Sequence, residues 1–91
     1  MLIVKTAAEW VSMPRADGRV WTAAMHRHDL FVWDAGALEG SWEIIQHAGY
    51  RPRSVVVASG DGERDADAAK LRAEAVYAAL THELVRFKGE P

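Results

Sequence analysis

The last quarter of this 91-residue chain carries the pattern that most constrains its fold. Apolar residues recur there at spacings of three and four, which places them on one face of a helix. They are Ala69, Ala73, Val76, Leu80, Leu84 and Phe87, and the opposite face carries Lys70, Arg72, Glu74 and Glu83. Asp65 is a suitable N-cap, and Gly89 is suited to end a helix in a left-handed turn. The pattern predicts one amphipathic helix over residues 65–88.

Short apolar segments, separated by glycine, proline and polar clusters, divide the chain before this helix, a pattern typical of β-strands. We expect strands at residues 9–13, 19–25, 30–34 and 54–59. Residues 41–47 are ambiguous, because this apolar run is too short for its periodicity to separate a strand from a helix. We favour a strand, since the neighbouring runs are rich in aromatic and β-branched residues. The alternative is a helix capped by Ser41, which would create a βαβ unit.

These elements predict an α+β fold: an antiparallel β-meander of three to five strands, over about residues 9–59, packed against one long C-terminal α-helix. The length suits a single domain over residues 1–91, and the 49% apolar and 26% charged residues are typical of a globular protein. No apolar run is long enough to span a membrane, so we expect a cytoplasmic protein. The lack of cysteine excludes disulfides, thiolate catalysis and cysteine-based metal sites.

The meander also predicts where charge collects, because successive connections of an antiparallel sheet alternate between its two ends. Loops at residues 14–18, 35–40 and 60–64 should share an end rich in carboxylates, where the helix begins. Loops at residues 26–29 and 47–53 should share the other, basic end, a segregation that the net charge of -2 conceals. We expect six residues at the basic end to bind a partner: Arg27, Tyr50, Arg51, Arg53, Arg86 and Lys88.

Apolar surface should remain uncovered in this fold. One helix covers one face of a sheet, yet residues 30–33 and 55–57 are apolar on both faces. The predicted helix would be about 36 Å long, which exceeds strands of roughly 20 Å. Uncovered apolar surface of this kind marks interaction sites, so we expect a homodimer or a protein partner.

His26, His28 and Asp29 are the most metal-like group, because imidazole and carboxylate groups are zinc ligands. His47 or His82 would be a third histidine ligand if it lies at the same end. The alternative, which we favour, is a polar turn with solvated or hydrogen-bonded histidines, since no second motif has a metal-binding spacing. We therefore predict no metal and no other cofactor.

The sequence favours a small non-enzymatic interaction protein that binds a macromolecular partner, most simply a protein, through its basic end and its exposed apolar face. No serine lies beside a histidine that would activate it. One alternative is a nucleic-acid-binding protein that uses the same basic end; another is a histidine-based, metal-dependent enzyme. Residues 57–60 and the alanine-rich residues 66–80 resemble small accessory proteins of phages and plasmids, which implies a regulator or an inhibitor of mobile-element type.

Overall fold

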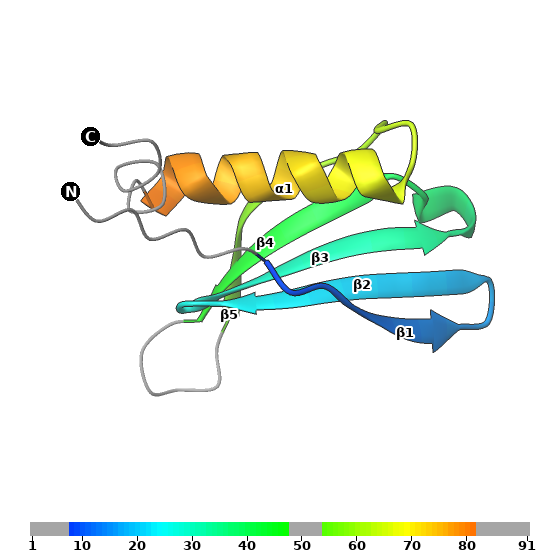
Figure 1. Cartoon of the computed structure of the whole chain (residues 1–91), viewed down its shortest axis with the longest axis horizontal. Helices are drawn as coiled ribbons and strands as arrows, with labels where there is room; N and C mark the ends of the chain where they lie inside the picture. The colour runs from blue at the N-terminus through cyan, green and yellow to red at the C-terminus, as the bar shows by residue number, and fades with distance from the viewer. Residues whose placement is uncertain (1–7, 48–53, 82–91) are drawn as a thin grey trace.

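The computed structural model describes residues 8–47 and 54–81. They form a five-stranded antiparallel sheet packed against one α-helix, which confirms the predicted α+β class (Figure 1). The elements are β1 (Val11–Arg15), β2 (Gly18–Met25), β3 (His28–Ala35), the 3-10 helix η1 (Gly36–Leu38), β4 (Ser41–His47), β5 (Ser54–Gly60) and α1 (Ala66–Thr81). Helix α1 begins as expected, while residues 82–88 of the predicted helix lie outside the described residues.

The sheet is a meander, because each strand pairs with the next one in sequence and the spatial order is β1-β2-β3-β4-β5. The ambiguous segment is strand β4, as we favoured. Its burial alternates: Trp42 is 7% exposed and Ile44 is fully buried, whereas the residues between and beside them are half-buried. Tertiary burial of alternate residues therefore selects the strand over the capped helix.

The hydrophobic core lies between α1 and one face of the sheet. Cross-strand neighbours Ala23, Leu30 and Ile44 are at most 1% exposed. From the helix side Ala69 and Ala73, both fully buried, pack on this face, and α1 lies across β3 and β4. Small side chains at these two helical positions allow the helix backbone to approach the sheet closely.

The buried stripe of α1 differs from the predicted stripe in its second half. Ala69, Ala73 and Tyr77, at a constant spacing of four, face the core, whereas Leu80 is 45% exposed and Val76 is half-buried. The expectation that Lys70 and Glu74 lie on the outer face was wrong. The Lys70 ammonium lies 3.4 Å from the Trp21 ring centroid, and Glu74 accepts a hydrogen bond of 2.7 Å from Trp10 Nε1. Tryptophans beside the helix therefore rotate it away from the stripe that hydrophobicity alone predicts.

The first turn of α1 is capped as the sequence predicts. The backbone N–H of Ala68 donates to Asp65 Oδ1 at 2.8 Å, which satisfies one of the free donors of the helix start.

Replacing this cap should weaken the fold measurably. We expect Asp65→Ala to lower the free energy of unfolding by about 1 kcal/mol, because an N–H of the first turn loses its acceptor. Asp65→Asn, which keeps an acceptor oxygen, is the matched control and should lose much less. Urea denaturation followed by circular dichroism measures both, and equal losses for the two variants would show that the hydrogen bond is not the stabilising feature.

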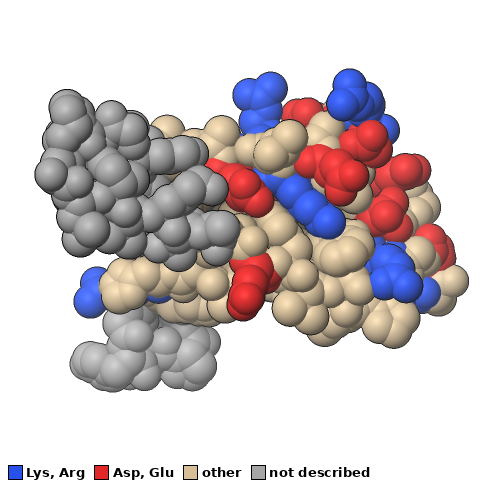
Figure 2. Space-filling view, viewed as in Figure 1, with Lys and Arg blue, Asp and Glu red and all other residues tan. Residues whose placement is uncertain are grey.

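The loops separate to the two ends of the sheet as the meander requires. At one end, the Glu63 N–H donates to the Gly40 carbonyl at 3.4 Å, which joins the loop after β3 to the segment before α1. At the other end, the His47 N–H donates to the Arg27 carbonyl at 3.0 Å. Figure 2 shows acidic side chains gathered around the end where α1 begins. The predicted acidic end is therefore present, and Arg27 lies at the opposite end.

Candidate functional site

The β2–β3 hairpin closes with a two-residue turn at the end of the sheet opposite the acidic loops. Met25 pairs with His28, so His26 and Arg27 form the turn. Arg27 has a φ of 60°, a left-handed conformation that glycine and asparagine adopt more readily than arginine. The hydrogen bond from His47 to the Arg27 carbonyl holds the turn against β4.

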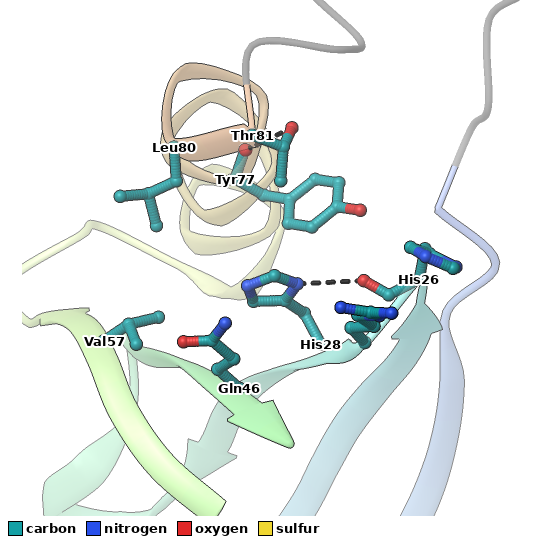
Figure 3. A pocket seen from close by; sticks show the side chains of 8 residues that line it. His26, His28, Gln46, Val57, Tyr77, Leu80 and Thr81 are labelled. Atoms are coloured by element: carbon teal, nitrogen blue, oxygen red, sulfur yellow. Dashed lines mark hydrogen bonds between the residues drawn. The ribbon is translucent and has the colours of Figure 1, made fainter. Parts of the chain in front are cut away.

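Between this hairpin and the Tyr77–Thr81 part of α1 lies a cleft of about 520 Å³, which we call the hairpin cleft (Figure 3). Side chains from β3, β4, β5, α1 and the turn surround it. The lining residues are His26, Arg27, His28, Gln46, Val57, Tyr77, Leu80 and Thr81. The volume falls within the range of small-molecule sites, about 300–1,000 Å³. The cleft thus combines several polar groups with apolar walls.

His28 is held in one orientation inside the cleft. Its Nδ1 lies 2.9 Å from the His26 carbonyl oxygen; since a carbonyl only accepts, Nδ1 carries the hydrogen. Its ring also packs edge-on against Tyr77, with centroids 5.3 Å apart and planes at 76°. Figure 3 shows the second ring nitrogen, Nε2, directed away from His26, toward the side of the cleft formed by Gln46, Val57 and Leu80.

The structure does not bring the metal-like group together. Adjacent residues of a strand point to opposite faces, so His28 faces α1 while Asp29 faces away from it. Asp29 Oδ2 instead lies 2.8 Å from His47 Nε2. Among residues 8–47 and 54–81, no three histidine or carboxylate groups are placed to hold a metal ion.

The predicted partner-binding residues are only partly described. Arg27 lies at the expected end and lines the hairpin cleft. The other five lie outside the described residues: Tyr50, Arg51, Arg53, Arg86 and Lys88.

Sequence reasoning missed Gln46, Tyr77 and Thr81 as cleft residues. The periodicity of the sequence could have identified two of them. Gln46 continues the alternation of Trp42 and Ile44, and Tyr77 continues the spacing of four from Ala69 and Ala73. For Thr81 no sequence signal pointed to the cleft, because its position depends on how α1 lies on the sheet.

The sheet face that points away from α1 carries a second apolar cluster, which we call the open face. The register places on it Val11, Met13, Val20, Phe31, Trp33, Ile45 and Val56. Val11, Met13 and Val56 are 60%, 45% and 49% exposed. The Phe31 and Trp33 rings lie side by side, with centroids 6.1 Å apart and planes tilted by 31°. The described part of the chain holds no second α-helix that covers this face.

Comparisons with known proteins give no family for this chain. No family model matches the sequence, and neither a curated protein nor a solved structure is significantly similar to it. Within the described residues, α1 is too short and too polar to cross a membrane.

Proposed function

We propose that this chain is a non-catalytic interaction protein whose main contact surface is the open face, and that its first partner is a second copy of itself. The observation that supports the proposal is the exposure of Val11, Met13 and Val56 on the same face as the neighbouring rings of Phe31 and Trp33. Exposed apolar side chains gathered on one face of a folded domain mark a protein interface.

The size of the open face suits a dimer. Five strands about 4.8 Å apart and roughly 24 Å long present a face of roughly 600 Å² in projection. Side-chain relief increases its accessible area toward the roughly 800 Å² that each partner buries in a standard interface. Face-to-face packing of two such sheets would remove the exposed apolar side chains of both copies from water.

Charge on the open face favours a self-complementary arrangement. Arg15 and Glu43 both belong to this face by the register, and neither makes an ion pair within the described part of the chain. Arg15 lies on β1 and Glu43 on β4, so they are separated by three strand spacings across the sheet and by four residue positions along the strand direction. This places them about 19 Å apart, so they cannot meet within one copy. A twofold dimer makes each contact twice, and Arg15 of one copy can then face Glu43 of the other.

A charge placed on the open face should break the dimer. We expect Met13→Lys to weaken self-association by roughly 30-fold or more, because an unpaired ammonium would be buried in an apolar interface. Leu71→Lys is the matched control: Leu71, 68% exposed on the outside of α1, is equally apolar but lies off the open face. Sedimentation velocity over a concentration series measures both. A folded wild-type protein that stays monomeric at micromolar concentration would contradict the proposal.

Reversing the two charges tests the pairing itself. Glu43→Arg and Arg15→Glu should each weaken the dimer, because each places like charges opposite one another. The double variant should recover much of the lost affinity, since the pair is restored with opposite polarity. Losses that simply add in the double variant would rule out this contact while leaving the open face as the interface.

A further inference from the structure

From the hairpin cleft we infer a second, separate function: it binds a small organic phosphate monoester, with the phosphate at the His26–Arg27 turn and the organic group against Val57 and Leu80. Nothing in this inference depends on the open face, because the cleft lies on the α1 side of the sheet, between the helix and the turn.

The charge of the cleft selects an anion. Three of its lining residues carry cationic or protonatable side chains, His26, Arg27 and His28, and the described lining includes no carboxylate. The nearest carboxylate in the strand, Asp29, points to the other face and is bound by His47. Guanidinium groups bind phosphate oxygens through two parallel hydrogen bonds, which gives arginine its advantage in phosphate recognition.

The two sides of the cleft differ in chemistry, and this difference sets the orientation of the bound ligand. Arg27, the arginine of the described lining, lies at the turn, so a phosphate is favoured there. The apolar side chains of Val57 and Leu80 stand on the other side (Figure 3). Gln46 and the fixed imidazole of His28 lie between the two regions, where they can bind polar atoms of the ligand.

The strained backbone of Arg27 is a second reason to place a ligand at the turn. Its left-handed backbone, with a φ of 60°, disfavours a side chain with a Cβ, so glycine would suit this turn better than arginine. Strained conformations of this kind concentrate at binding sites, where the side chain is kept for its function. The presence of a long cationic side chain at this strained position is explained if its guanidinium binds a ligand.

This strain gives a test that separates folding from binding. Arg27→Gly should keep or raise stability, because glycine adopts a positive φ without strain. In isothermal titration calorimetry with phenyl phosphate as the probe, we expect the wild-type protein to bind with a dissociation constant of about 1 mM or below. Arg27→Gly should weaken that binding roughly 10-fold or more, which corresponds to loss of a charge-assisted hydrogen bond.

The controls locate the site and the ligand class. Arg64→Ala removes the same charge from a side chain that is 85% exposed at the opposite end, and it should leave binding unchanged. Amide NMR shifts on titration should concentrate at His28, Gln46 and Thr81. Inorganic phosphate should bind more weakly than phenyl phosphate, because it lacks the group that contacts the apolar wall.

Three results would overturn the inference. They are equal affinity for Arg27→Gly and the wild-type protein, shifts confined to residues outside the cleft, and Arg27-dependent binding of a single-stranded oligonucleotide with no binding of phenyl phosphate. The last result would identify a nucleic-acid surface instead of a small-molecule site. None of them bears on dimerisation, and Met13→Lys should bind phenyl phosphate as the wild-type protein does.

Discussion

Leu30→Ala should lower the free energy of unfolding by about 2–5 kcal/mol, enough to unfold much of the population of a small domain. Leu30 is fully buried at the centre of the core, between Ala23 and Ile44 on the neighbouring strands and beneath α1. Truncation removes its burial energy and leaves a cavity that the paired strands cannot close. Thermal and urea denaturation measure the loss.

The same substitution at an exposed leucine provides the control. Leu71 is 68% exposed on α1, and alanine has the higher helix propensity, so Leu71→Ala should change stability by roughly 0.5 kcal/mol or less. Similar losses at the two positions would mean that Leu30 does not lie in the centre of the core, and that the assigned face of β3 is wrong.

Gly40→Ala should be among the most damaging small substitutions in the described chain. Gly40 has a φ of 84°, and a Cβ at this position would overlap the backbone carbonyl oxygen of Glu63. The overlap involves backbone on both sides, so it is relieved only when the loop after β3 separates from the segment before α1. That movement would strain the hydrogen bond from the Glu63 N–H to the Gly40 carbonyl.

Gly62 is the matched control for Gly40, because it has the same backbone strain without the steric overlap. It has a similar φ of 79°, but an added Cβ would meet nothing within 4 Å. Gly62→Ala should therefore cost only the strain of the left-handed backbone, about 1–2 kcal/mol. Gly40→Ala should cost about 1–3 kcal/mol more, the usual penalty of overpacking. Equal losses in urea denaturation would show that the two loops are not in close contact.

For the fold, the meander could be predicted because its signals are local. Alternating apolar residues, turn residues at regular intervals and the Asp65 cap each act within a few residues of their own position. The alternation of loop ends then follows from antiparallel pairing alone, and it correctly placed Arg27 opposite the acidic loops.

For the candidate site, local signals identified His26, Arg27 and His28 but not the cleft that they line. The metal-like grouping treated His28 and Asp29 as neighbours, whereas strand geometry points them to opposite faces. The cleft also needs Tyr77 from α1, and hydrophobicity favoured Val76 and Leu80 as the buried residues there.

By itself, then, the sequence predicted the strands, the helix, the order in which the strands pair and the end of the sheet that is rich in carboxylates, because these depend on residues close together in the chain. At residues 41–47, burial of alternate residues in the folded core decided between strand and helix. Tertiary structure decided the rotation of α1 about its axis. Ala69, Ala73 and Tyr77 face the sheet because the small alanines permit close approach, while Trp21 and Trp10 hold Lys70 and Glu74 at the flank of the helix. That rotation brings Tyr77 and Thr81 to the hairpin and forms the cleft, and no local pattern specifies it, because the tryptophans are more than 45 residues from their helical partners.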